Sequence, residues 1–295
     1  MAGIVIVATD FSPSAREAIG HAARIASHRG AALHALTVVD SDHINAMASS
    51  LKLSREEVGL QVTQRTLMML GNELKDAGHE NAAQLHVATG RPVDEIDNLC
   101  ERLGAGLLVL GYQGKSERGR GPGTVASRCV RNAPCDVLLT RRGHPDAFGL
   151  VVAGVDFTDS TDLVIEAARS AVNPDGGRLV LLHAHANPFD ALSYTGLGYD
   201  DPTTYDDFTE SFRRDLEKAA ERLQADSPGE TVSAQVLVNA HHGRAIAAWC
   251  TDQKADLVVV GTRRKPGLRY WLLGSTAEYI LKETECAVMA VRGPT

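Results

Sequence analysis

Short apolar runs alternate along this chain with longer segments in which apolar residues recur every three or four positions. In the first half, the apolar runs that have the length of buried strands are 4–8, 33–39, 85–88, 107–110 and 137–140. The segments with the spacing of amphipathic helices are 14–27, 54–75, 93–103 and 125–131. Strands and helices in alternation predict an α/β fold, in which a parallel sheet is covered by helices on both faces.

The second half repeats the first in the same order. Residues 7–12 (VATDFS) match 153–158 (AGVDFT), and residues 135–141 match 286–292; Gly90-Arg91 is matched to Gly243-Arg244. Each half has roughly 145 residues, the size of one domain, and the breaker-rich stretch 142–149 separates them. We therefore predict two domains, 1–145 and 146–295. The short linker favours two packed halves over two independent domains. We predict that they pack about a pseudo-twofold axis, as an intrachain pseudo-dimer, with the last strands near 137–140 and 288–291 as the seam, because each is short, apolar and otherwise an edge strand.

A glycine-containing loop follows the fourth apolar run of each half and leads into a helix. Its key residues are Gly111, Gly114, Gly123 and Thr124 in the first half, and Gly261, Gly274 and Ser275 in the second. Glycine lets the backbone turn sharply and approach a ligand closely. The helix N-terminus after the loop offers free N–H groups to an anion. The sequence therefore predicts a phosphate-binding loop in each half.

An aspartate ends the first strand of each half, at Asp10 and Asp156. In a functional interpretation, these carboxylates accept hydrogen bonds from the ribose or the base of a nucleotide. In a structural interpretation, each bonds the backbone N–H groups of the Ser/Thr-rich turn that follows. Their place at the carboxyl edge of the sheet, where α/β proteins bind ligands, favours the functional interpretation.

Charge, apolar run lengths and cysteine spacing indicate which kinds of partner and which cellular compartment to expect. The formal net charge is −7, with all of the acidic excess in the second half, which weighs against broad nucleic-acid binding. No apolar run is long enough to cross a bilayer, and the N-terminus lacks the pattern of a signal peptide. The five cysteines form no Cys-x-x-Cys pair, as is typical of reduced thiols. We expect a cytoplasmic protein with no nucleic-acid or membrane partner.

These motifs resemble the universal stress protein family in its tandem two-domain form. The resemblance rests on the strand ending in Asp-Phe-Ser/Thr, on the Gly-loop-Gly-Ser/Thr-helix arrangement, and on residues 133–139 (APCDVLL), and it spans both halves. It implies two tandem Rossmann-like domains of the adenine nucleotide alpha hydrolase-like type, each with a five-stranded parallel sheet. In the family's ATP-binding branch, the aspartate after the first strand helps to hold the adenosine. The resemblance thus implies ATP as cofactor, with Mg²⁺ only as the companion of the nucleotide.

Neither loop fits the pattern of that branch, which is Gly, two residues, Gly, nine residues, Gly and Ser or Thr. The first half has only eight residues between Gly114 and Gly123, and the second has Arg264 in place of the second glycine. Shortening a flexible loop by one residue costs little free energy, whereas a long side chain in a phosphate cradle costs space or strain. We therefore favour occupation of the first half and expect Arg264→Gly to improve phosphate binding in the second. Lys115, Arg118 and Arg120 are either phosphate neighbours or a solvated basic loop.

No catalytic residue and no resident metal site are predicted. The chain has no Gly-x-Ser-x-Gly elbow, so we expect ATP hydrolysis that is slow at most. The expected function is that of a stress-response or regulatory protein that binds ATP in at least one domain and acts through nucleotide-dependent conformation or partner binding. Its protein partners and self-association into a homodimer are left open. The alternatives are an interaction protein that needs no nucleotide, and a second domain that binds a lipid or zinc. The zinc alternative rests on His183, His185 and the pair His241-His242.

Overall fold

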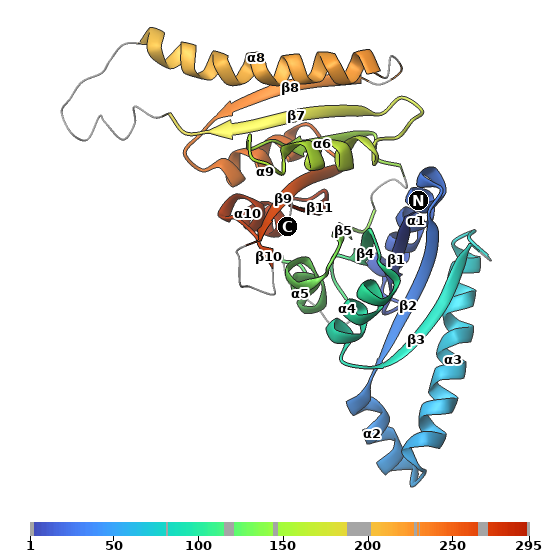
Figure 1. Cartoon of the computed structure of the whole chain (residues 1–295). Helices are drawn as coiled ribbons and strands as arrows, with labels where there is room; N and C mark the ends of the chain where they lie inside the picture. Colours follow the sequence, from blue (N-terminus) through green and yellow to red (C-terminus); the bar gives the residue numbers. More distant parts are fainter. Residues whose placement is uncertain are drawn as a thin grey trace, which may run out of the picture. The chain divides into compact units, whose positions relative to one another are not determined.

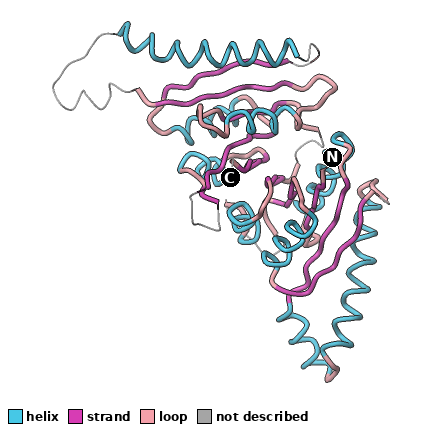
Figure 2. Tube along the Cα trace, in the orientation of Figure 1, coloured by secondary structure: helices cyan, strands magenta, loops and turns pink. Residues whose placement is uncertain are grey.

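The computed structural model describes residues 3–80, 82–114, 121–143, 147–187, 202–226, 229, 231–264 and 271–293. The chain divides into two compact units, of which unit 1 contains Met1–Asp146 and unit 2 contains most residues from Ala147 onward. Helices and strands alternate in both units, as Figure 2 shows by colour. None of the described helices is long and apolar enough to cross a membrane.

Unit 1 is a parallel sheet with helices on both faces (Figure 1). Its elements are β1 (Ile4–Ala8), α1 (Pro13–Arg29), β2 (Ala32–Asp40), α2 (Ser41–Leu51), α3 (Arg55–Asp76), β3 (Ala83–Gly90), α4 (Pro92–Leu103), β4 (Leu107–Gly111), α5 (Thr124–Asn132) and β5 (Asp136–Thr140). The strands lie in the order β3-β2-β1-β4-β5, and all of these pairs are parallel. Helices α1 and α3 cover one face and are joined by an ion pair between Arg16 and Glu73 at 2.9 Å. Helices α4 and α5 pack together on the other face.

Unit 2 has the same topology. Its elements are β6 (Leu150–Gly154), α6 (Thr161–Arg169), β7 (Arg178–His185), α8 (Pro202–Asp226), β8 (Thr231–Val238), α9 (His242–Asp252), β9 (Leu257–Arg264), β10 (Trp271–Leu272), α10 (Ser275–Glu283) and β11 (Ala287–Arg292). The strand order β8-β7-β6-β9-β11, again parallel, mirrors that of unit 1. The predicted fold class, two tandem Rossmann-like α/β domains, is confirmed.

Local sequence signals explain where several helices begin and end. Ser54 and Glu57 form a capping box at the start of α3, with the Glu57 N–H donating to Ser54 Oγ at 3.1 Å. Helix α1 begins after Ser12, whose hydroxyl accepts from the Ala15 N–H, and ends at Gly30, which has a φ of 60°. Helix α2 was absent from the predicted elements. It begins immediately after β2, with Asp40 as its N-cap.

The match of Gly90-Arg91 with Gly243-Arg244 is wrong, because the two dipeptides do not occupy equivalent places in the two units. Gly90 ends strand β3, whereas Gly243 lies inside helix α9. A Cβ at Gly243 would lie 2.8 Å from Tyr279 Cβ and 3.0 Å from the Thr276 carbonyl oxygen, so a glycine is needed there for α9 to pack on α10. The identical Gly-Arg dipeptides therefore serve different backbone positions.

Helix α8 packs on β7 through a cluster of histidine and phenylalanine rings. His183 and His185 stack with ring centroids 5.8 Å apart, and Phe212 of α8 lies 4.6 Å from His183 and 5.1 Å from His185. The Nδ1 atom of His183 lies 2.8 Å from the Val155 carbonyl oxygen, so this nitrogen carries the proton of the neutral ring. His183 is only 8% exposed, and its Nε2 has no partner among the described residues. The environment therefore favours a neutral imidazole.

We expect the stability of the fold to decrease as the pH falls below about 6.5. Burial lowers the pKa of His34, of His86 and of His183, so these groups are held neutral in the folded protein. The unfolded chain protonates them near pH 6.5; the stability is therefore complete above that pH and is lost as the pH falls through the lower pKa values of the folded state. Urea midpoints at pH 7.5 and 5.5 measure the effect. The difference should shrink in His183→Phe but not in a control, His79→Gln; an undiminished difference in His183→Phe would contradict the role of His183.

Candidate ligand-binding cavity

Unit 1 has a cavity of about 360 Å³ at the carboxyl ends of its strands. It lies between β1 and β4. The strands that follow β1 are added on one side of it up to β3 and on its other side from β4 onward, so the strand order switches at this point. This switch point is where open α/β sheets bind their ligands. Four of the residues predicted from the sequence line the cavity together: Asp10, Gly111, Gly114 and Gly123. Thr124 is the first residue of α5, directly beside Gly123.

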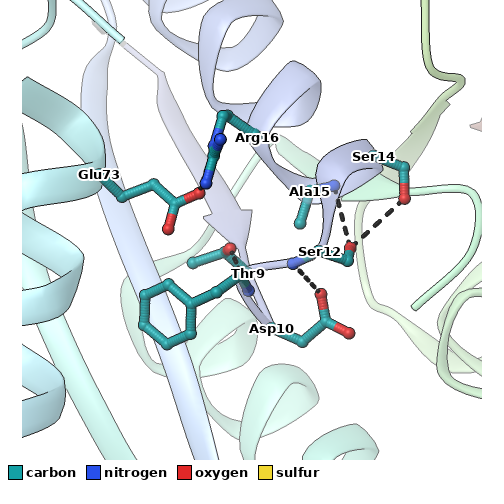
Figure 3. Close-up of polar contacts among 8 residues, drawn as sticks. Thr9, Asp10, Ser12, Ser14, Ala15, Arg16 and Glu73 are labelled. Carbon is teal, nitrogen blue, oxygen red and sulfur yellow. Dashed lines mark hydrogen bonds and ion pairs between the residues drawn. The ribbon is translucent and has the colours of Figure 1, made fainter. Parts of the chain in front are cut away.

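Asp10 shapes the turn between β1 and α1 (Figure 3). Its Oδ1 accepts the Ser12 N–H at 2.9 Å, and the intervening Phe11 has a φ of 62°. Non-glycine residues rarely adopt this left-handed conformation, which is commonly held in place at functional sites. Asp10 therefore does stabilise the turn, as the structural interpretation predicted. The same residue also lines the cavity.

Close packing against backbone, rather than a special backbone conformation, requires the first glycine of the loop, whereas the second lies next to the end of the Asp10 side chain. A Cβ at Gly111 would lie 2.7 Å from the backbone nitrogen of Ala15, at the start of α1. A Cβ at Gly114 would lie 2.8 Å from Oδ2 of Asp10. The five predicted glycines, Gly111, Gly114, Gly123, Gly261 and Gly274, are all described, and none of them has a positive φ. Backbone strain at a positive φ is therefore no reason to expect a cost from Arg264, because Gly114, the matching residue of unit 1, does not adopt such a conformation.

Although the first loop is one residue shorter than the second, α5 and α10 begin with the same backbone conformation. Gly123 is the N-cap of α5 with φ −61° and ψ 162°, and Gly274 is the N-cap of α10 with φ −64° and ψ 161°. The Gly123 N–H donates to the Tyr112 carbonyl at 2.8 Å, which ties the two ends of the loop together. Both helices thus present equivalent N-termini to a ligand. Lys115, Arg118 and Arg120 lie outside the described residues.

The matching aspartate of unit 2 holds a turn and also pairs with an arginine. Asp156 Oδ1 accepts the Thr158 N–H at 3.2 Å and the Thr158 hydroxyl at 2.6 Å, while its Oδ2 pairs with Arg263 Nη2 at 3.0 Å. Partial burial by itself would raise the pKa of Asp156, but the hydrogen bonds from Thr158 and Arg263 outweigh it and hold the pKa below the ordinary value. Phe157 has a φ of 55°, so the turn has the same form as in unit 1.

The other predicted residues of unit 2 lie at the corresponding places. A Cβ at Gly261 would lie 2.8 Å from Ser160 Oγ, whereas a Cβ at Gly274 would meet nothing within 4 Å. Ser275 opens α10. Strand β9 extends to Arg264, while β4 ends at Gly111, so Arg264 continues a strand where unit 1 has already entered its loop. The side chain of Arg264 lies outside the described residues.

The structure also places residues around the cavity that were not predicted from the sequence. They are Asp40 and His43 at the start of α2, Gln113 in the loop, and an apolar group from β2 and α4. Leu36, Val38 and Asp40 are each two residues apart on β2 and so lie on the same face of the strand. This spacing was the only signal in the sequence from which their common place in the cavity could have been predicted. Gln113 occupies the position of Arg263, and its Nε2 donates to the Gly121 carbonyl at 3.0 Å.

The histidines of unit 2 do not form a metal site with the described residues around them. No three His, Cys, Asp or Glu side chains in the described part of the chain are placed to hold one metal ion. His183 and His185 instead belong to the ring cluster beneath α8, where His185 Nε2 lies 3.3 Å from the Thr209 hydroxyl. The sequence signal, two histidines on one face of a strand, is thus accounted for by packing.

Comparisons with known proteins agree with the fold and extend over both units. The model of the universal stress protein family matches residues 1–141 and again residues 148–292. A universal stress protein of Mycobacterium tuberculosis (strain CDC 1551) is 25% identical over 309 residues, covering 98% of this chain and 95% of that protein. One from Methanocaldococcus jannaschii is 28% identical over 143 residues, covering 46% of this chain and 79% of that protein. The crystal structure of a universal stress protein from Archaeoglobus fulgidus DSM 4304 aligns with a TM-score of 0.65 at 18% identity, over 98% of this chain and 96% of that one.

Proposed function

This chain belongs to the universal stress protein family, and from that premise we propose that unit 1 binds an adenine nucleotide, ATP, in the cavity at the ends of β1 and β4. The observation that carries the proposal is the convergence of Asp10 with Gly111, Gly114 and Gly123 on one cavity at the switch point of the sheet. The protein then acts as a stress-response regulator, through a nucleotide-dependent conformation or through partner binding.

Different residues of the cavity contact different parts of the nucleotide. The N-terminus of α5, which begins at Thr124, faces the phosphates, because the positive end of its helix dipole favours an anion. Asp10 lies in the turn after β1, the strand next to β4, and accepts hydrogen bonds from the ribose hydroxyls. Mg²⁺ accompanies the nucleotide. The proposal assigns no catalytic residue, so any hydrolysis of ATP is slow.

Unit 2 is the weaker candidate for occupation. Its set of Asp156, Gly261, Gly274 and Ser275 has the same arrangement, but Arg264 stands in place of the second glycine of the family's pattern, and the Asp156 carboxylate pairs with Arg263. Both side chains are at least half exposed, and exposed ion pairs contribute only about 0–1 kcal/mol. Arg263 therefore hinders this site without closing it, and improved phosphate binding by Arg264→Gly remains a prediction.

We place the protein in the cytoplasm, since its five cysteines are buried and none of them is in a disulfide. The competing proposal is an interaction protein that works without nucleotide. The absorbance at 260 nm of the supernatant from heat-denatured, purified protein separates the two, because bound nucleotide is released on unfolding. An adenine spectrum supports nucleotide binding. Protein that releases no nucleotide and also fails to bind added ATP would favour the nucleotide-independent function.

A further inference from the structure

We infer that Asp40 makes the cavity of unit 1 selective for a base with an exocyclic amino group, so that 6-aminopurine nucleotides bind better than 6-oxopurine nucleotides. This inference rests on the proposed function. Asp40 is the last residue of β2 and the N-cap of α2, and it lines the same cavity as Asp10.

The wall of the cavity beside Asp40 suits a flat ring. Leu36, Val38 and Asp40 are two residues apart on β2, so they share one face of the strand, and all three line the cavity. Pro92 and Ile96, in the first two turns of α4, line it from the helix layer. Four apolar side chains thus form a slot for the faces of a base, with a carboxylate at its end.

One oxygen of that carboxylate is left for a ligand. Asp40 Oδ1 accepts the Asp42 N–H at 2.8 Å, which caps α2. Oδ2 makes no hydrogen bond with any described residue. An ionised carboxylate only accepts hydrogen bonds. A 6-amino group can donate to it, whereas a 6-oxo group in the same place presents another acceptor, so that neither the 6-oxygen nor Asp40 Oδ2 gains a hydrogen bond there.

The spacing between strands places this contact at the base end of a nucleotide. The order β2-β1-β4 puts Asp40 two strands away from the loop that follows Gly111, a separation of about 10 Å at the usual spacing of strands. A nucleotide whose phosphates lie at the N-terminus of α5 and whose ribose lies at Asp10 therefore carries its base toward Asp40. At that distance, screened by solvent, the carboxylate repels the phosphates only weakly.

Unit 2 lacks this feature. The match of Leu36 with Leu182 sets Ala186 opposite Asp40, directly after the end of β7 at His185. The methyl side chain of alanine cannot accept a hydrogen bond. Selection between amino and oxo bases by this mechanism is accordingly a property of unit 1 alone.

Titrating the full chain with ATP and with inosine triphosphate tests the inference, because the two nucleotides differ at the 6-position of the base. We expect the wild type to bind ATP about tenfold more tightly or better, from the cost of unsatisfied polar groups. In Asp40→Asn the preference should fall to within about threefold, because an amide can either donate or accept. Asparagine remains a good N-cap, so α2 is retained. Asp42→Asn, on the same helix and exposed, is the matched control and should keep the wild-type preference.

Each outcome decides a different point. Equal binding of both nucleotides by the wild type, or an unchanged preference in Asp40→Asn, overturns the role of Asp40 and leaves nucleotide binding intact. Failure of the wild type to bind either nucleotide overturns the proposed function together with this inference. Asp40→Ser, which also caps the helix, repeats the test with a smaller hydroxyl side chain and should likewise lose the preference.

Discussion

Replacing Gly111 with alanine is expected to destabilise unit 1 by about 2–3 kcal/mol, a typical cost of overpacking. The added Cβ would lie 2.7 Å from both Ala15 N and Ser14 C, which are backbone atoms at the start of α1. Backbone cannot yield as the end of a flexible side chain can, so α1 must move away from β4. That movement would also pull on the turn that Asp10 holds and weaken the cavity.

Thermal melts of the full chain measure this effect, and other glycines provide controls. Gly59 lies inside α3, where an added Cβ would meet nothing within 4 Å, so Gly59→Ala should raise stability by about 0.5–1 kcal/mol through helix propensity. Gly261→Ala should cost less than Gly111→Ala, because its nearest contacts are the side chains of Ser160 and Val164. A Gly111→Ala variant that melts like the wild type would show that α1 does not constrain this position.

Replacing Asp10 with asparagine is expected to weaken ATP binding about tenfold. The amide oxygen can still accept the Ser12 N–H, so the turn is kept, but the charged acceptor for the ribose is lost. Hydrogen bonds to charged groups contribute about 1.5–3 kcal/mol, and 1.4 kcal/mol corresponds to tenfold in affinity. Calorimetric titration of ATP measures the change.

The matched substitution in unit 2 shows which aspartate matters. Asp156→Asn should leave the affinity for ATP nearly unchanged if unit 1 holds the nucleotide. A loss confined to Asp156→Asn would move the site to unit 2. If neither substitution changes the affinity, the two carboxylates serve only the turns that they stabilise.

The elements of the fold could be predicted from the sequence because their signals are local. The apolar run 4–8 became β1, and the spacing of Ser54 and Glu57 marked the start of α3. Helix α2 was missed. It begins at the last residue of β2, where no separate loop signals its N-cap, Asp40.

The candidate site could be predicted only in part, because the sequence does not reveal which neighbour makes a residue necessary. Gly111 and Gly114 were expected to make room for phosphate, yet the nearest atoms to a Cβ there belong to α1 and to Asp10. The cavity itself depends on the order of strands, which brings β1 beside β4 across about 100 residues of chain. Asp40 and His43 join the site through that tertiary arrangement and carry no motif of their own.

The most direct test of the central claim is the number of ATP molecules bound by the full chain, measured by calorimetry on protein freed of nucleotide. Val125 lines the cavity of unit 1, and Thr276 is its counterpart after Gly274-Ser275. The account predicts one ATP per chain for the wild type, loss of binding in Val125→Trp, where the indole fills the cavity, and retention of binding in Thr276→Trp. No binding by the wild type, or binding that survives Val125→Trp but is lost in Thr276→Trp, would contradict it.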